Sequence, residues 1–271
     1  MLKNEGDRLT RVAVCSPQSE YFRVDNLQAH NIREVANPEL ARVQHAALSS
    51  LLANRGVGLI DIGEFPGHPN SVFTRDMAVG TPKGYIRASM GIPTRVGEDR
   101  RMADALDRLG EPFVGAIQPP GIVEGGDVVL AGPVAFVGQT KRTNPEGIRQ
   151  LTDLFDRMGV EVRVCRLPEA YLHLDQAIGL LGPDRLMVCR NLFSWELFRG
   201  YQTVLMPGQC FNVNFICLAP DEIIVPAANL PLIDAAEENN FLAHILDLSE
   251  FAKGTGGPNC LIMPIERRQK P

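Results

Sequence analysis

The sequence predicts an α/β propeller with five-fold pseudosymmetry, in which repeated ββαβ units surround a central active site. A strand, a tight turn, a second strand and usually a helix recur about five times along the 271 residues. Successive units begin about 40 to 50 residues apart, a period that is typical of propellers and arrays. The predicted first strands begin at polar or reactive residues, namely Asp76, Glu124, His173, Asn212 and Cys260.

The composition indicates a protein with an ample core. With 45% hydrophobic residues and a formal charge of −5, we expect one large domain or two small ones and no binding to nucleic acid. No apolar signal core and no run of roughly 20 apolar residues is present, which predicts a cytoplasmic protein without a membrane partner. The six cysteines form no C-x-x-C pair, so we expect reduced thiols and no metal site.

The N-terminal segments are predicted from their periodicity. Residues 11–16 form a β-branched run that indicates a buried strand, and residues 18–37 form a long polar loop of the kind that often acts as a lid. A helix is expected over 38–55 and a second strand over 57–62. The apolar face predicted for the helix consists of Leu40, Val43, Ala47, Leu48, Leu51 and Leu52.

Four hairpins follow, and each has a turn rich in glycine or proline. Their strands are expected at 71–80 with 85–88, 125–131 with 134–137, 173–181 with 185–189, and 211–218 with 222–225. Helices are expected at 97–110, 145–159 and 230–242, and a further strand at 160–165. The fifth unit joins residues 260–265 to the N-terminal strand. In a closed ring, equivalent strand starts would face the axis and converge.

A cysteine and a histidine in one pocket form a nucleophile and its acid/base partner. Cys260 follows a Gly-Gly-Pro loop, although a lone cysteine is more often a buried core residue, and His173 alone could be structural. Asp76, Glu124 and Asp175 add more carboxylates than one histidine needs. Because carboxylates pair with the planar guanidinium group, we expect thiolate attack on a guanidinium carbon.

At these residues the sequence resembles the guanidino-group-modifying enzymes, the pentein superfamily, and most closely arginine deiminase. The motifs that carry the resemblance are residues 69–76 (PNSVFTRD), 124–127 (EGGD), Arg142 with its neighbour, 173–175 (HLD) and 256–260 (GGPNC). They keep the family's order and span most of the chain. The resemblance implies a single catalytic domain over residues 1–271, folded as a five-fold propeller that needs neither a metal nor an organic cofactor.

The resemblance also implies a role for each matching residue. Cys260 corresponds to the nucleophile, His173 to the general acid and then base, and Glu124 to the partner of the histidine. Asp76 and Asp175 correspond to the pair that grips the guanidinium group. Asn70, Arg95 and Arg142 correspond to residues that hold the amino-acid end of the substrate.

The expected reaction is hydrolysis of arginine to citrulline and ammonia through a covalent amidino-cysteine. Asp175 favours an unsubstituted guanidinium group, because N-methyl groups would remove its hydrogen-bond donors. The short segments between motifs resemble dimethylarginine dimethylaminohydrolase, which is the alternative. An amidinotransferase is less favoured, and a non-catalytic pentein is disfavoured by the Cys/His/acid set. The expected partner is a small guanidino compound, and the sequence leaves a homo-oligomer and a lid at 18–37 open.

Overall fold

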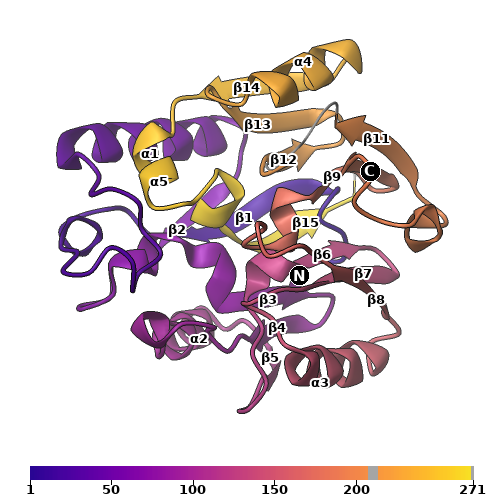
Figure 1. Ribbon diagram of the computed structural model, residues 1–271, viewed down its shortest axis with the longest axis horizontal. Coiled ribbons are helices and arrows are strands. Elements are labelled where there is room, and N and C mark those ends of the chain that lie inside the picture. The colour runs from indigo at the N-terminus through magenta and orange to yellow at the C-terminus, as the bar shows by residue number, and fades with distance from the viewer. Residues whose placement is uncertain (207–212, 270–271) are drawn as a thin grey trace.

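Five three-stranded sheets form a ring in the computed structural model, which describes residues 1–206 and 213–269 (Figure 1). In every sheet the first two strands are antiparallel and the third runs parallel to the second. β15 pairs with β1, so the two ends of the chain close the ring. The predicted five-fold α/β propeller is therefore confirmed.

The strands of each sheet follow one another along the chain, apart from the closing sheet. That sheet contains β15 (Met263–Arg268), β1 (Arg8–Val14) and β2 (Gly58–Asp61). The others contain β3 (Ala78–Thr81), β4 (Gly84–Arg87) and β5 (Phe113–Ala116); β6 (Val128–Ala131), β7 (Val134–Gln139) and β8 (Glu161–Arg166); β9 (Ile178–Gly182), β10 (Arg185–Cys189) and β11 (Gln202–Met206); and β12 (Ile216–Ala219), β13 (Glu222–Pro226) and β14 (Leu242–Leu246).

Helices lie around the outside of the ring (Figure 1). They are α1 (Pro38–Asn54), α2 (Glu98–Arg108), α3 (Pro145–Asp156), α4 (Leu230–Glu238) and the short α5 (Ser249–Lys253). The Asn37 side chain accepts hydrogen bonds from the first amides of α1, and Asn144 does the same for α3. The unit of β9–β11 has the short 3₁₀ segment Trp195–Phe198 where the other units carry a helix. No helix in the described part of the chain has the length and apolar character needed to cross a membrane.

The buried face of α1 differs from the predicted one. Leu48 and Leu52 are buried, but Leu40 and Val43 are 52% and 66% exposed. The inner face instead includes Gln44, whose side chain bonds to Ser249 and to the backbone of Glu250. A polar contact with α5 therefore replaces part of the expected apolar stripe, which hydropathy alone does not reveal.

The predicted first strands begin too early. Short 3₁₀ turns occupy their starts, at Thr74–Met77, Gly125–Asp127, Leu174–Gln176 and Asn259–Leu261. Each turn leads into the innermost strand of its sheet, so the polar residues lie on turns at the ends of these strands. Asn212, the predicted start of the fourth hairpin, lies outside the described residues. Strands β5, β11 and β14, which pair only on one side, were not predicted.

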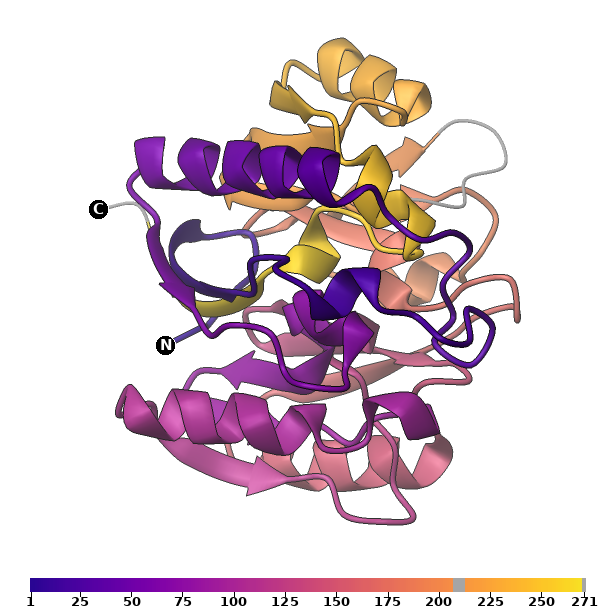
Figure 2. The same cartoon turned by 90° about the vertical axis from the view of Figure 1, so that its left-hand side faces the viewer.

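The segment between β1 and α1 remains mostly without regular structure, as predicted for residues 18–37, apart from the 3₁₀ turn Glu20–Phe22. In Figure 2 its dark indigo trace reaches the side of the ring opposite the two chain ends. The N-terminal residues cross the ring, where Glu5 pairs with the buried Arg75 at 2.9 Å. A largely buried ion pair therefore lies inside the ring.

Replacing Leu48 by Ala should cost about 2–4 kcal/mol of unfolding free energy, because a fully buried leucine leaves a cavity. The matched change Leu40→Ala, on the exposed side of the same helix, should cost less than about 0.5 kcal/mol. Urea denaturation of both variants measures the difference. Equal losses would contradict the packing of α1 described above.

Candidate active site

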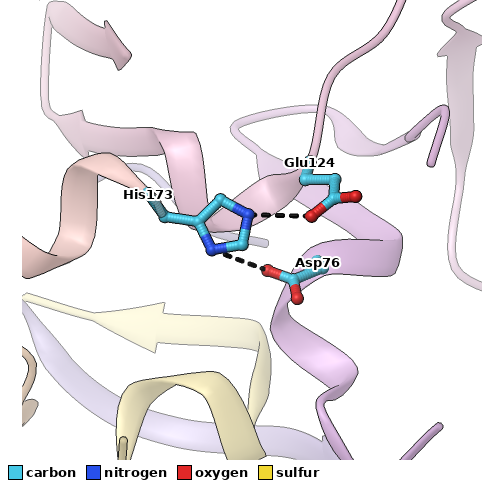
Figure 3. Close-up of side chains that lie close together, drawn as sticks. All are labelled: Asp76, Glu124 and His173. Carbon is cyan, nitrogen blue, oxygen red and sulfur yellow. Dashed lines mark hydrogen bonds and ion pairs between the residues drawn. The ribbon is translucent and has the colours of Figure 1, made fainter. Parts of the chain in front are cut away.

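The 3₁₀ turns bring side chains from different units together near the ring axis. Asp76 lies within its turn, Glu124 and His173 immediately precede theirs, and Cys260 is the middle residue of the last turn. All four side chains are buried. Asp76, Glu124 and His173 come from three different sheets and point toward one another (Figure 3).

His173 lies between two carboxylates. Its Nε2 is 2.8 Å from Oε2 of Glu124, and its Nδ1 is 3.8 Å from Oδ1 of Asp76. Glu124 accepts further hydrogen bonds from Nη1 of Arg142, at 3.1 Å to both carboxylate oxygens, and from the amide of Gly91. The Glu124 contact is a direct hydrogen bond, whereas the contact of Nδ1 with Asp76 is a longer ion pair.

These contacts determine the protonation of the pair. Burial lowers the pKa of His173, but the charge of Asp76 and the hydrogen bond to Glu124 outweigh it and raise the pKa above its usual value. Burial raises the pKa of Glu124, yet the hydrogen bond and charge of His173 lower it further than burial raises it. At neutral pH the pair is therefore an imidazolium and a carboxylate, which makes His173 a proton donor.

The EGGD motif of residues 124–127 also helps to position His173. A Cβ atom on Gly126 would lie 2.8 Å from Cγ of His173 and 2.9 Å from Oδ1 of Asp76, so only glycine allows this approach. Asp127 accepts hydrogen bonds from the amide of Leu174 and from the Thr140 hydroxyl. Burial raises the pKa of Asp127 to about 7. The motif thus orients His173 through its backbone as well as through Glu124.

Cys260 receives two weak hydrogen bonds at its sulfur. Nδ2 of Asn214 lies 3.5 Å from Sγ, and the amide of Gly257 lies 3.4 Å from it. Oδ1 of Asn214 accepts from the amide of Asn259, so Asn214 connects the β12 unit to the cysteine turn. Sequence reasoning missed Asn214, because it took the strand to begin at Asn212. The signal was there, since Asn214 follows Asn212 on the same side of an alternating run.

The thiol of Cys260 is protonated in the free site. Burial raises the pKa of Cys260 well above its usual value, and the negative charges of Asp175 and Asp76 raise it further. The hydrogen bonds from Gly257 and Asn214 lower the pKa but do not compensate. A cation bound next to the sulfur would reduce the repulsion and favour the thiolate.

The two carboxylates predicted to bind a guanidinium group lie in different positions. Asp76 lines the cleft that contains Cys260 and His173, and its Oδ1 is buried without a hydrogen-bond partner. Asp175 accepts from Nδ2 of Asn259 at 3.1 Å and lines a second, narrow cavity instead. Burial raises the pKa of Asp175 to about 6.

Arg95, Arg142 and Asn70 all line the cleft. Arg95 donates from Nε to Glu98, from Nη1 to Asp76 and from Nη2 to the carbonyl of Phe73. All three nitrogen atoms of its guanidinium group thus already have protein acceptors. Arg142 uses Nη1 for Glu124. Both arginines therefore neutralise carboxylates of the site, and their predicted contact with a substrate carboxylate stays a prediction.

The loop over residues 18–37 contributes to the cleft through His30 and Asn31. A wider and more open cavity adjoins the cleft and shares Asn31, Arg142, Leu172 and Thr255 with it. These four residues mark the neck between the buried cleft and the surface.

Asp76, Glu124 and His173 each offer a ligand atom within 4.8 Å of the others, a spacing that could hold a metal ion. The hydrogen bond between Glu124 and a protonated His173 opposes this use, because a metal needs the neutral imidazole. The expectation that the site works without a metal stays a prediction.

Comparison with known proteins places this site in a family. A sequence profile described as "N,N dimethylarginine dimethylhydrolase, eukaryotic" matches residues 17–244. The dimethylarginine dimethylaminohydrolase of Streptomyces coelicolor is 31% identical over 238 residues, which cover 88% of this chain and 90% of that protein. The enzyme of the same name from Pseudomonas aeruginosa is 27% identical and is covered to 93%. The arginine deiminase of Limosilactobacillus reuteri is 23% identical, with 73% of this chain and 62% of that protein covered.

Solved structures agree on the fold. The Pseudomonas aeruginosa dimethylarginine dimethylaminohydrolase, in a cysteine-to-serine variant complexed with citrulline, superposes with a TM-score of 0.81 at 23% identity over 94% of this chain and 99% of that one. An amidinotransferase of Microseira wollei superposes with a TM-score of 0.76 at 18% identity over 99% of this chain and 97% of that one. The chain belongs to the pentein superfamily of guanidino-group-modifying enzymes and, within it, to the dimethylarginine dimethylaminohydrolase family.

Asp175→Asn should make Cys260 more reactive, because it removes a negative charge that raises the pKa of the thiol. We expect alkylation by iodoacetamide at pH 8 to become roughly three to ten times faster. The difference should vanish below the pKa of about 6 at which Asp175 itself becomes neutral. Mass spectrometry of the peptide containing Cys260 measures the rate.

Asp153→Asn, on the exposed side of α3, is the matched control and should leave the rate unchanged. Equal rates for Asp175→Asn and the control at pH 8 would show that the charge of Asp175 does not act on the thiol.

Proposed function

We propose that this protein is an amidine hydrolase that converts the guanidino group of an arginine-type amino acid to the ureido group of citrulline. The observation that carries the proposal is the convergence of Cys260, His173 and Asp76 on one buried cleft, with Glu124 bonded to His173. This set supplies a nucleophile, a proton donor and a carboxylate acceptor for a cation. Membership of a family of such hydrolases supports the same reaction class.

We propose Nω,Nω-dimethylarginine as the substrate, with citrulline and dimethylamine as products. The relatives that this chain matches over most of their length carry that activity in their names, whereas the arginine deiminases are matched over less of theirs. These relatives therefore favour dimethylarginine, the alternative substrate predicted from the sequence, over arginine, the first choice. The position of Asp175 agrees, since it lies outside the cleft lining and need not receive donors from the methylated nitrogen.

Unsubstituted arginine is the second candidate. Oδ1 of Asp76 and Oδ1 of Asp175 are both buried without hydrogen-bond partners. Buried carboxylate oxygens without hydrogen bonds are costly, even though Oδ1 of Asp76 has a long ion-pair contact with His173, and an unsubstituted guanidinium group has enough N–H donors for both. If the substrate reached both oxygens, methylation would remove one of these bonds.

The first half of the proposed mechanism forms a covalent intermediate. The guanidinium cation binds against Asp76 and lowers the pKa of the neighbouring Cys260 thiol, which releases its proton to solvent. The thiolate adds to the guanidinium carbon, and the carbon–nitrogen bond to the leaving amine breaks. His173, held as an imidazolium by Glu124, gives its proton to that amine. An amidino-cysteine remains, and His173 is neutral.

The second half consumes one water. Neutral His173 takes a proton from a water molecule as its oxygen attacks the amidino carbon. The carbon–sulfur bond then breaks, and the remaining proton of the added hydroxyl passes to the sulfur as the carbonyl forms, which releases the ureido product and restores the Cys260 thiol. His173 is again an imidazolium, so the cycle balances with one water consumed and one amine released. Glu124 stays ionised throughout and stabilises the charge that His173 gains.

We further propose that the amino-acid end of the substrate lies at the neck of the cleft. Arg142 borders both cavities, and its hydrogen bonds to Glu124 use only Nη1. Arg142 is therefore better placed than Arg95 to receive an α-carboxylate, because all three nitrogen atoms of Arg95 have protein partners. Asn70 borders the same cleft and offers an amide to that end.

A substrate panel tests the proposal. Purified protein should release citrulline from dimethylarginine, with dimethylamine in equal amount, and more slowly from arginine, with ammonia. Arginine with glycine should give no guanidinoacetate. Turnover of arginine but not of dimethylarginine would reverse the choice of substrate, and transfer to glycine would replace hydrolysis.

Cys260→Ala should lower kcat by at least about a thousandfold, because no covalent intermediate can form. Cys165→Ala, which removes another buried thiol away from the cleft, is the control and should retain activity. Acid quenching of the wild-type reaction followed by mass spectrometry should show the amidino adduct on the peptide with Cys260. Full activity in Cys260→Ala would refute the mechanism.

A further inference from the structure

His30 lies in the cleft, although it belongs to the irregular loop before α1 and carries no motif. It is only 7% exposed and lines the cleft together with Asn70, His173 and Cys260. Its Nε2 faces Asp25 at 3.3 Å, but the Asp25 side chain is 90% exposed. The better buried contact of His30 is therefore the one on its other ring nitrogen.

His30 and Asn70 are joined by two hydrogen bonds. Nδ2 of Asn70 donates to the carbonyl of His30 at 3.1 Å, and Nδ1 of His30 lies 3.2 Å from Oδ1 of Asn70. Because Oδ1 can only accept, Nδ1 of His30 carries the hydrogen. Turning the Asn70 amide around would place its oxygen against the His30 carbonyl and its NH₂ against the ring N–H. The two bonds thus allow one orientation of the Asn70 amide.

The backbone around His30 is held independently of its ring. Asn31 donates from Nδ2 to the Thr255 hydroxyl, which in turn donates to the carbonyl of Asn31, both at 3.0 Å. The amide of Arg33 bonds to the carbonyl of Lys253, and the Thr94 hydroxyl bonds to the carbonyl of Ala29. The contacts of Asn31 and Arg33 fasten the loop to the segment before Cys260, and that of Ala29 fastens it to the turn Pro93–Arg95. Removing the imidazole should therefore leave the loop in place.

We propose that His30 is a positioning residue that orients the Asn70 amide to recognise the α-amino and α-carboxylate groups of the substrate. The inference rests on the proposed function, in which Asn70 meets the amino-acid end. In the fixed orientation Asn70 keeps one N–H and one lone pair beyond those used by His30. An N–H suits a carboxylate and a lone pair suits an ammonium, so the pair selects α-amino acids over simple alkylguanidines.

Three substitutions of His30 separate the roles of its ring nitrogens. Replacement by Leu removes both ring nitrogens. Replacement by Asn keeps an N–H near the position of Nδ1, and replacement by Gln keeps an N–H near the position of Nε2. His30→Leu should raise KM for the amino-acid substrate roughly ten- to a hundredfold with kcat changed less than about threefold. His30→Asn should restore KM to within about threefold of wild type, and His30→Gln should not. Asp25→Asn, the control for the exposed contact, should match wild type.

Binding to the Cys260→Ser variant extends the test to ligands that turn over slowly. Calorimetry should show that His30→Leu weakens binding of arginine and dimethylarginine but leaves binding of butylguanidine, which lacks both polar groups, unchanged. Equal weakening for butylguanidine, or failure of His30→Asn to rescue, would overturn the proposal. Circular dichroism checks that each variant folds. If His30→Leu does not fold, the difference in KM between His30→Asn and His30→Gln decides whether the N–H at Nδ1 is needed.

The failure of the proposed function would look different. In that case the wild-type protein would neither bind nor convert any arginine derivative, and the proposed role of His30 would fail together with the proposed function. Turnover by wild type with an unchanged KM in all three His30 variants would overturn the role of His30 alone.

Discussion

The hydrogen bond between His173 and Glu124 is the interaction on which the arrangement of the site depends. It joins two units of the ring at a point where neither side chain reaches solvent. A buried ion pair is stable only when its remaining hydrogen-bonding atoms are satisfied. Arg142 and the amide of Gly91 do this for Glu124, and the glycine at 126 lets Asp76 approach the imidazole. Breaking the pair would leave an uncompensated charge in the centre of the ring.

The same constraint explains why the site suits a cationic ligand. Carboxylates surround the thiol, and Arg95 and Arg142 neutralise Asp76 and Glu124 without reaching every oxygen. Burial raises the pKa of Cys260, and the charges of Asp175 and Asp76 raise it further, so the thiol is protonated in the free protein. In the proposed function, a bound guanidinium group would supply positive charge beside the sulfur and favour the thiolate.

The residues of the candidate site could be found from the sequence because they occupy equivalent places in a repeat. Asp76, Glu124, His173 and Cys260 each precede an inner strand, and a closed ring must bring such positions together. Asn214 was missed because the start of its strand was assigned to Asn212, two residues earlier in the same alternating run. The partners of Arg95 were also unpredictable, since Glu98 and Asp76 reach it from opposite sides only after folding. Hydropathy likewise misplaced the inner face of α1, where Gln44 makes specific polar contacts.

By itself, the sequence determined the repeat, the closing of the ring by its two ends, and the residue types that meet at the axis. These follow from local periodicity and chain order, which need no knowledge of distances. Only the tertiary structure decided that Asp76 lines the cleft while Asp175 faces a second cavity, that both arginines bind protein carboxylates, and that His30 reaches Asn70 from a distant loop. Those outcomes depend on side-chain packing to within an ångström or so between segments far apart in the chain, and no local pattern encodes them.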